Sequence, residues 1–531
     1  MRVSKILFFT PGLFGIFFIL VPYNDNVSEF AITDLIPIFF IFLLGIALFS
    51  LIMKKIIKDS AKSFLVSTLV TVVFFIYVPI HHSFFLGPPE VLLKDVHEIY
   101  TLQENETLGH IILLPGMLIA LLVTLFFLIK SKKNFKNALK ISFVIALSLV
   151  FFNIGEITYY TVQSNLIPDN SVETFSVDQD NPRDVYYIIL DAHASTAVLK
   201  KYFNYDNSDF ENFLKEKGFF IPEFSFSNYY TSNASIPSTL NMDYIHHSMI
   251  QGKHPNLTFQ KALIETATAK NFERNGYEII SITNEYNLHP SEKSIKVCGN
   301  DLRGFRVFSF YLDTTPIKIF KSTIYSVLNK TSTEQVDIST QPLIENRTCA
   351  LSELPDIRNN FSHPMFVQAH LIMPHSPFIF DSKGDIVNFR ALSNEQFPNA
   401  YLEQLQYTDI KIQEIVEKLL DSEPKPIIIL QSDHGVRFQL NEKDEQPLDH
   451  SFLNFDAYYF PDIELDKDEY PVTTPVNSFR ILFNEYFGTD YELLENRAFL
   501  EFQNETKFAG ATISKNWVFD DVTHLVIENR P

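Results

Sequence analysis

The sequence predicts an all-α membrane region followed by an exported α/β domain whose mostly parallel sheet is covered by helices on both faces. Three observations indicate this architecture. Five apolar windows of bilayer-spanning length lie within the first 160 of the 531 residues, and none recurs after them. Beyond residue 160, strand-like runs alternate with helix-like runs. The strand-like runs are apolar throughout, which is typical of strands buried on both faces.

The five apolar windows are each about as long as a helix needs to cross a bilayer. They lie near residues 6–23, 34–53, 64–80, 109–129 and 141–160. The first window follows the basic leader MRVSK and could instead be a signal peptide, but it ends in VPYNDN, which offers no small-residue cleavage site. We therefore expect a retained anchor and a five-span transmembrane domain over residues 1–160.

The basic residues orient these spans, because loops rich in Lys and Arg tend to stay in the cytoplasm. The segment before the first span and two alternate loops carry the basic residues Arg2, Lys5, Lys54, Lys55, Lys58, Lys62, Lys130, Lys132, Lys133, Lys136 and Lys140. The intervening loops carry only Lys94. The pattern predicts a multi-pass protein of the plasma (inner) membrane, with a cytoplasmic N-terminus and with the chain after about residue 160 extracytoplasmic.

The part of the chain after residue 160 is strongly acidic, with 31 Lys+Arg against 53 Asp+Glu and a net charge of −22. Such a surface repels phosphate backbones, so we expect no nucleic-acid partner. Both cysteines, Cys298 and Cys349, lie in this part. An oxidising compartment permits a disulfide between them, and two unpaired thiols are the alternative.

Residues 161–183 have no sustained period and read as a linker before the exported domain, which spans 184–531. Within this domain, the β-rich run DVYYIILD covers 184–191, and MFVQAHLIM and PIIILQSD cover 365–373 and 426–433. The runs SDFENFLKEKGF, FQKALIETATAKNFERNGY and YLEQLQYTDIKIQEIVEKLL read as helices, and YEIISIT reads as a strand. The polar run STEQVDISTQ, near 332–341, reads as a loop.

Two of the apolar strands end in a carboxylate. Asp191 closes the first, and Asp433 and His434 close the strand at 426–433. In open α/β sheets, ligands collect at the carboxyl ends of the strands, where a carboxylate can hold a metal. The alternative is an ordinary turn, with Gly435 supplying a positive φ.

Two further segments contribute polar groups. SNYYTSNASIPSTLNMDY, at 227–244, places several hydroxyls just before an expected helix, whose N-terminus could hold an anion; the alternative is an N-cap within an ordinary Ser/Thr turn. HLIMPHSPFIFD, at 370–381, presents His375 in a rigid Pro-flanked turn, and the alternative is a turn histidine without a partner.

With these motifs in this order, the chain resembles the membrane-anchored sulfatase-like proteins of the alkaline phosphatase superfamily, related to the lipoteichoic acid synthases. The resemblance covers about 184–490. It rests on DVYYIILDAHAS, EKGFFI, SNYYTS, STLNMDY, HLIMPHSPFIFD, IIILQSDHG and TPVNSFRILFNEYFG. It implies an alkaline-phosphatase/sulfatase-like sheet sandwiched by helices.

The resemblance also implies one divalent cation, Mn²⁺, Mg²⁺ or Zn²⁺, since the ligands would be two carboxylates, an imidazole and a hydroxyl oxygen. These metal ligands are Asp191, Asp433, His434 and the nucleophile, which aligns with Ser232; Thr231 stays a one-residue alternative. His375 would contact the substrate, either steadying a developing oxyanion or protonating the leaving oxygen.

Several positions depart from the family pattern. In DAHAS, where relatives more often read Asp-Gly-Tyr, we expect His193 to be an exposed loop histidine, with a substrate contact or a further ligand as alternatives. Val436 stands where Pro is usual, which leaves Arg437 as an anion contact. The run SIPST partly mimics a formylglycine-forming sulfatase signature, but Thr239 replaces its Arg. Ser235 is therefore a weaker nucleophile candidate than Ser232.

The resulting hypothesis is a membrane-anchored, metal-dependent phosphodiester transferase or hydrolase. Its phosphate- or sulfate-ester substrate would be a membrane lipid headgroup or an envelope glycan, attacked by a hydroxyl nucleophile. Two alternatives remain open. One is a sulfuric ester hydrolase on the same fold, and the other is a catalytically silent membrane sensor or scaffold.

Overall fold

The computed structural model describes residues 7–25, 32–81, 96–165, 175, 182–247, 266–282, 289–291, 293–298, 303–320, 341–389, 392–437, 449–508 and 511–528. These residues form two compact units. One unit comprises 1–166 with 301–338, and the other comprises 167–300 with 339–531. The predicted loop at 332–341 lies almost entirely outside the described residues, as does most of the predicted linker at 161–183; the first linker residues are the end of a long helix.

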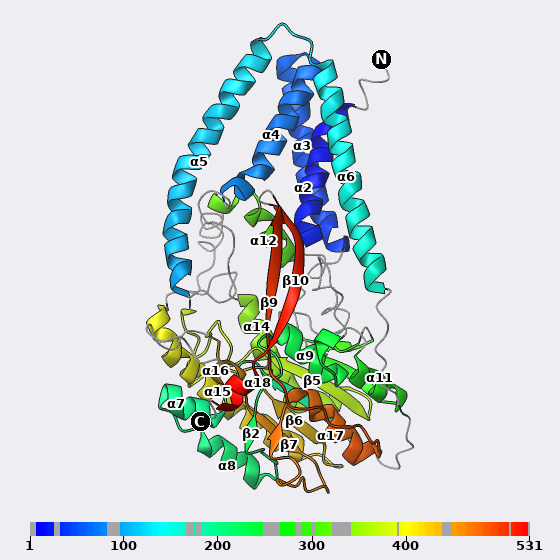
Figure 1. Cartoon of the computed structure of the whole chain (residues 1–531), viewed down its shortest axis with the longest axis vertical. Helices are drawn as coiled ribbons and strands as arrows, with labels where there is room; N and C mark the ends of the chain where they lie inside the picture. The colour runs from blue at the N-terminus through cyan, green and yellow to red at the C-terminus, as the bar shows by residue number, and fades with distance from the viewer. Residues whose placement is uncertain are drawn as a thin grey trace. The chain divides into compact units, whose positions relative to one another are not determined.

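The first unit is all helical (Figure 1). Its elements are η1 (Leu7–Phe9), α2 (Thr10–Asp25), η2 (Ile32–Asp34), α3 (Leu35–Ile57), α4 (Ser60–His81), α5 (Val96–Lys130), α6 (Lys136–Asn165) and α12 (Arg303–Asp313). Five stretches are long and apolar enough to cross a membrane: Leu7–Asn24, Ile32–Ile57, Ser60–His81, Gly109–Lys130 and Lys136–Tyr159. The five predicted apolar windows are confirmed as helices of that kind.

Helix α12 comes from the later part of the chain but packs on the N-terminal helices. Val307 and Tyr311 are buried in the same apolar cluster as Ile19 and Leu35, and the Tyr311 hydroxyl donates to the Ile19 carbonyl at 2.7 Å. The apolar and aromatic face of α12 is therefore removed from solvent by packing against the helices of the first unit. Residues 301–338 lie within the range predicted for the exported domain, 184–531, yet they belong to the same unit as the N-terminal helices. The predicted domain boundaries at 160 and 184 remain predictions.

The second unit is built around a six-stranded sheet of order β4-β3-β5-β1-β6-β7. The strands are β1 (Val185–Leu190), β3 (Glu278–Ile282), β4 (Ile295–Val297), β5 (Met365–Leu371), β6 (Ile427–Gln431) and β7 (Asp456–Tyr459). Every pairing is parallel except that of β6 with β7. The predicted strands at 184–191, 365–373 and 426–433 are therefore neighbours in the centre of the sheet.

Helices surround the sheet and join its strands. They are α7 (Thr196–Phe203), α8 (Ser208–Glu216), α9 (Ser232–Asn241), η4 (Ile245–His247), α11 (Ala267–Arg274), α14 (Gln341–Glu353), η5 (Leu354–Asn360), η7 (Asn394–Gln396), α15 (Phe397–Leu420), α16 (Asp449–Phe452), α17 (Pro475–Phe487) and α18 (Thr523–Glu528). Two small two-stranded sheets complete the unit: β2 (Phe224–Ser225) with β8 (Val472–Thr473), and β9 (Phe499–Phe508) with β10 (Ala511–Asp521).

Strand β1 shows why the sheet is covered on both faces. Its six residues are all buried and alternate between two apolar clusters. Val185, Tyr187 and Ile189 face the cluster of α9, α11 and α17, whereas Tyr186, Ile188 and Leu190 face that of α8, α14 and α15. Because successive strand side chains point to opposite faces, a strand with no polar residue must be covered on both. The predicted fold class is confirmed.

Cys298 and Cys349 form a disulfide, so the pairing that the sequence left open is present in this structure. The bond joins the residue after β4 to helix α14, which the chain separates by 51 positions. It therefore ties the edge of the main sheet to one of the helices that cover it.

Candidate active site

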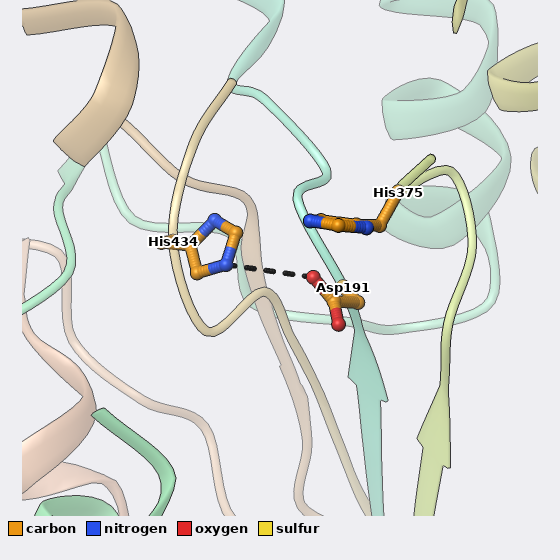
Figure 2. Close-up of side chains that lie close together, drawn as sticks. All are labelled: Asp191, His375 and His434. Carbon is orange, nitrogen blue, oxygen red and sulfur yellow. Dashed lines mark ion pairs between the residues drawn. The ribbon is translucent and has the colours of Figure 1, made fainter. Parts of the chain in front are cut away.

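The carboxyl ends of β5, β1 and β6 lie side by side, because β1 pairs in parallel with both neighbours and the three strands end at nearly the same level. Asp191 directly follows β1, Asp433 and His434 follow β6, and His375 follows β5. Figure 2 shows Asp191 at the tip of its strand between His375 and His434. The topology thus brings together residues that the sequence separates by more than 240 positions.

His434 lies at the centre of this cluster. Its Nε2 is 3.5 Å from Asp191 Oδ1, 3.6 Å from Asp433 Oδ2 and 3.2 Å from Ser232 Oγ. Its Nδ1 is 2.8 Å from the Gly435 carbonyl and donates a hydrogen bond to it. This bond fixes the tautomer whose Nε2 carries a lone pair, and Nε2 therefore faces the two carboxylates and the hydroxyl as an acceptor or a metal ligand.

Two buried carboxylate oxygens of this cluster have no hydrogen-bond partner among the residues that the structure describes. They are Asp191 Oδ1 and Asp433 Oδ2, the same two atoms that face His434 Nε2. Burying a charged oxygen without a partner is costly, and such atoms in native proteins call for an explanation. Two carboxylate oxygens, an imidazole nitrogen and a hydroxyl that converge in this way fit a divalent cation.

The electrostatics of the cluster agree with that fit. Burial alone would raise the pKa of Asp191, but the facing histidines, His375 first, hold this pKa below its ordinary value. Burial and the charge of Asp191 raise the pKa of Asp433 to about 6. Burial and the nearby Arg437 lower the pKa of His434 well below its usual value, so its imidazole stays neutral. A neutral imidazole is the form that binds metals.

Ser232 begins helix α9, and Thr231 is its N-cap residue. The predicted helix therefore lies within the hydroxyl-rich segment and does not follow it, because the apolar side of this segment, with Ile236 and Leu240, packs into the core beside the sheet. Ser232 is half-buried at a helix N-terminus, where free N–H groups and the helix dipole favour an anion. Ser235 is only 1% exposed, so its hydroxyl is closed to a substrate.

Arg437 and His375 stand together at the edge of the cluster. An Arg437 amine donates to His375 Nε2 at 3.2 Å, and His375 Nδ1 donates to the Ser376 carbonyl at 2.6 Å. The guanidinium also lies 5.5 Å from the ring centre of Tyr230. The two side chains are only partly buried, so both are available to an anionic ester beside the carboxylate cluster.

The turn residues next to the site correct one expectation. Gly435 does not adopt a positive φ. A Cβ at this position would lie 2.2 Å from the His450 carbonyl oxygen, so glycine is required there by the close approach of two backbones. The left-handed residue is Ala192, at φ 63°, directly after Asp191. Ala192 occupies the position at which the family pattern has Gly.

The expectation of an exposed loop histidine at position 193 is wrong. His193 is fully buried, with its Nε2 2.8 Å from Asp409 Oδ1 and its ring 4.9 Å from that of Phe455. Its side chain reaches helix α15, which carries Asp409, while its backbone N–H donates to Ser432 Oγ at 2.9 Å. The residue therefore serves the packing between β1 and α15 and makes no contact in the described part of the chain that would mark it as a metal ligand.

Two residues near the site were missed by the sequence reasoning. His370, on β5, places Nε2 3.1 Å from Asp191 Oδ2 and forms a second possible metal-binding group with Asp191 and Asp433. His370 is the first residue of the motif HLIMPHSPF, in which the sequence pointed to His375. Its closeness to Asp191 becomes visible only from the strand order, in which β5 pairs with β1. Glu501, on β9, accepts hydrogen bonds from the backbone of Tyr230 and Thr231, and no local motif marks it.

Comparisons with known proteins find one matching family model and several similar structures. A family model described as Sulfatase matches residues 187–463, whereas no curated protein matches the chain. The chain is similar to the periplasmic domain of EptC from Escherichia coli, with TM-score 0.40 and 11% identity over 61% of this chain and 90% of that one. It is also similar to the integral membrane protein lipooligosaccharide phosphoethanolamine transferase A (EptA) from Neisseria meningitidis, with TM-score 0.38 and 12% identity over 91% and 95%. A third similar structure is the phosphonate monoester hydrolase of Agrobacterium radiobacter, with TM-score 0.38 and 12% identity over 62% and 82%.

Proposed function

Because the chain belongs to the sulfatase family, as its motifs predicted, we propose that it is a membrane-anchored, metal-dependent phosphodiester transferase or hydrolase. One observation carries this proposal. The buried oxygens Asp191 Oδ1 and Asp433 Oδ2 accept no hydrogen bond from any described residue and face His434 Nε2, which lies 3.2 Å from the Ser232 hydroxyl. A site of this composition combines a cation-binding set with an accessible nucleophile.

The residues proposed to hold the cation are Asp191, Asp433, His434 and Ser232. When bound, Mn²⁺, Mg²⁺ or Zn²⁺ supplies a lowered pKa for the serine hydroxyl and offsets negative charge on the ester. The chain keeps the imidazole of His434 in the required tautomer through its bond to the Gly435 carbonyl. It also presents Ser232 at the first turn of α9, whose N-terminus favours an anionic group.

In the proposed reaction, Ser232 Oγ attacks phosphorus in line, an Oγ–P bond forms, and the bond from phosphorus to the leaving oxygen breaks. The serine proton is released to water. His375 protonates the leaving oxygen, and Arg437 contacts the non-bridging oxygens. Since Arg437 donates to His375 Nε2 at 3.2 Å, it must turn to the ester before His375 can act as the acid. Attack by water or a second alcohol then breaks the Oγ–P bond and restores the hydroxyl.

The proposed substrate class follows from the anchor. Five helices are long and apolar enough to cross a membrane, and the lysine-rich loops predict that the catalytic unit lies outside the cytoplasm. We propose an inner-membrane enzyme that acts on lipid headgroups or envelope glycans carrying phosphate esters. The acidic exported part disfavours a nucleic-acid substrate.

A sulfuric ester hydrolase is the second candidate, because the family includes sulfatases by its description. Formylglycine chemistry has little support in this chain. Both cysteines are bound in a disulfide, and buried Thr239 stands where the signature of formylglycine-forming sulfatases has Arg. A silent sensor or scaffold is disfavoured by the complete set of candidate ligands and the hydroxyl beside it.

The test uses the full chain purified in detergent, with its Ser232→Ala and Asp433→Ala variants. Metal content is measured first, and turnover is then compared on bis(4-nitrophenyl) phosphate, 4-nitrophenyl phosphate and 4-nitrophenyl sulfate. We expect about one divalent cation per chain, lost in Asp433→Ala, and phosphodiester turnover that falls on the order of 10³-fold or more in Ser232→Ala. A sulfate preference would favour the second candidate. If the chain binds no metal and turns over no ester, even with added divalent cations, the remaining interpretation is a catalytically silent sensor or scaffold.

A further inference from the structure

A buried carboxylate contacts the backbone of the two residues that precede the proposed nucleophile. Glu501, on β9, is 2% exposed, and its two oxygens accept hydrogen bonds from the backbone N–H groups of Tyr230, at 2.9 Å, and Thr231, at 2.6 Å. These are the two residues that precede Ser232. When Glu501 is ionised these are charge-assisted bonds, which are roughly twice as strong as neutral ones, and the carboxylate then holds this piece of backbone firmly.

The strand that carries Glu501 runs beside the nucleophile loop. Tyr229 and Phe499 form a parallel bridge, and the Phe499 N–H donates to the Asn228 carbonyl at 2.9 Å. Two residues further along β9, the Glu501 carboxylate accepts hydrogen bonds that a backbone carbonyl would accept in an ordinary strand pairing. The first residues of the β9–β10 hairpin, seen in Figure 1, thus support residues 228–231 along their whole length.

Fold stability alone gives little reason for an acid at this position. Burial raises the pKa of Glu501 to about 7, and the hydrogen bonds from Thr231 and Tyr230 offset only part of that effect. Glu501 forms no ion pair with any residue in the described ranges. Backbone carbonyls, as in an ordinary strand pairing, would accept the same hydrogen bonds without a buried charge. A costly group kept beside a reactive hydroxyl points to a role in placing that hydroxyl.

We propose that Glu501 is a positioning residue for the nucleophile: its carboxylate fixes the backbone of Tyr230 and Thr231 and thereby sets Ser232 at the start of α9. The inference rests on the proposed function, in which Ser232 attacks the ester. Glu501 lies outside the matched range 187–463, so nothing in the family model assigns it a role.

The same contact separates the two hydroxyl candidates. A hydrogen bond from the Thr231 side chain to Glu501 lowers the pKa of that carboxyl group. Ser232 Oγ, in contrast, lies 3.2 Å from His434 Nε2. Glu501 therefore engages Thr231 on the side of β9 and leaves Ser232 as the hydroxyl at the carboxylate cluster. The carboxylate acts through the backbone and touches no reacting atom.

The test compares Glu501→Gln with the parent and with the matched control Glu495→Gln in the full chain in detergent. Glu495 lies on the same segment, and its exposed side chain pairs with Arg497 at the surface. Gln keeps the size of Glu but places an amide N–H against a backbone donor. Three quantities are measured: kcat and KM on bis(4-nitrophenyl) phosphate, metal content, and hydrogen exchange of the amides at 230 and 231. Thermal unfolding monitors folding.

We expect Glu501→Gln to lower kcat between about 10- and 100-fold, because small misplacement of a reacting group has effects of this size. KM should stay within about threefold, metal content should be retained, and exchange at 230 and 231 should become faster. Glu495→Gln should match the parent in every readout.

Unchanged exchange at 230 and 231, or unchanged kcat in an active enzyme, would overturn the proposal. If Glu501→Gln does not fold, Glu501→Asp, which keeps the charge one methylene shorter, is measured in its place; loss of folding in both would overturn the positioning role in favour of a structural one. If the parent turns over no ester, the proposed function fails, and the exchange result alone decides whether Glu501 holds the loop.

Discussion

Asp184 and Asp191 stand at the two ends of strand β1, and each is 2% exposed, yet their surroundings differ. Asp184 Oδ1 accepts from His363 Nδ1 at 2.9 Å and from the Met365 N–H at 3.1 Å, and Oδ2 lies 3.3 Å from an Arg358 amine. One oxygen of each carboxylate, Asp184 Oδ2 and Asp191 Oδ1, accepts no hydrogen bond in the described part of the chain. The Asp184 oxygen lies against the Arg358 guanidinium, whereas Asp191 faces histidines, with Oδ1 3.5 Å from His434 Nε2.

The comparison shows that the extent of burial does not by itself reveal the role of a carboxylate. Two identical side chains on one strand, buried to the same extent, differ because one pairs with an arginine, which is always charged, and the other faces histidines, which also bind metals. A buried carboxylate with a cation partner holds structure together, whereas one without such a partner is prepared for a ligand. The amino end of β1 is thus a structural clamp, and its carboxyl end is the site.

The largest effect is expected for Asp191→Asn. Removing one proposed ligand should abolish metal binding and lower turnover on the order of 10³-fold or more, because the ligand set acts as a unit. Thermal stability of the metal-free chain should fall, because the facing histidines that hold the pKa of Asp191 below its ordinary value favour its charged form in the folded chain. Metal content, phosphodiester turnover and thermal unfolding check this. Retained metal with full activity would contradict the assignment of this end of β1.

Asp456 extends the comparison to a third buried aspartate of the same sheet, one with only neutral partners. Its carboxylate accepts from Asn454, Thr473 and Tyr458, and burial raises its pKa to about 7. A raised pKa means that the folded state binds the proton more tightly. The group therefore contributes stability below its unfolded pKa of about 4, and this stability is lost as pH rises toward 7.

Asp456→Asn should remove that pH dependence. Relative to the parent, the variant should gain stability as pH rises from about 4 to 7, by at most on the order of 4 kcal/mol, and the two should be similar near pH 4. Thermal unfolding of both chains in detergent across this range provides the measurement. Since Glu501 is present in both, its own titration cancels in the difference. A constant gap between the two chains at every pH would count against the raised pKa.

Asp184→Asn should act on stability and spare the chemistry. The substitution removes the ion pair with Arg358, whose side chain is 22% exposed, and should lower the free energy of unfolding by about 2 kcal/mol. Metal content and kcat of the folded protein should remain at parent levels. Chemical unfolding and metal analysis check both halves, and a loss of metal comparable to that of Asp191→Asn would erase the distinction between the two ends of β1.

The smallest effect concerns Ala192, the left-handed residue after Asp191. Alanine at φ 63° carries a steric strain that glycine avoids, but glycine adds freedom to the unfolded chain. Ala192→Gly should therefore stabilise the protein by only about 0.5 kcal/mol. A thermal shift of this sign would show that strain sits at the site end of β1. Substantial destabilisation would mean that the Ala192 methyl group is needed for packing.

The sequence was sufficient where a signal is local. Apolar windows without charges predicted the five helices, and apolar runs that end in Asp predicted the central strands and placed Asp191, Asp433 and His434 at one sheet edge. Motif order placed Ser232, His375 and Arg437 in the same region, and the structure brings all six residues together. Their roles as metal ligands, nucleophile and substrate contacts remain predictions.

Other features depend on which elements become neighbours, and no local pattern encodes this. His193 is buried because α15 brings Asp409 to it, although a histidine in a loop motif is commonly exposed. His370 meets Asp191 because β5 pairs with β1, an order that the chain does not display. The disulfide joins two cysteines whose proximity the sequence left undecided.

By itself, the sequence determined the class of each segment and the chemistry of the strand ends, because hydrophobic periodicity and turn residues act over a few positions. Only the tertiary structure decided which charges are compensated. Asp184 and Asp191 are the same residue in the same strand, and Glu501 reaches Thr231 across 270 positions. The free energy of a buried charge depends on the atoms within a few ångströms, and only the folded chain places those atoms.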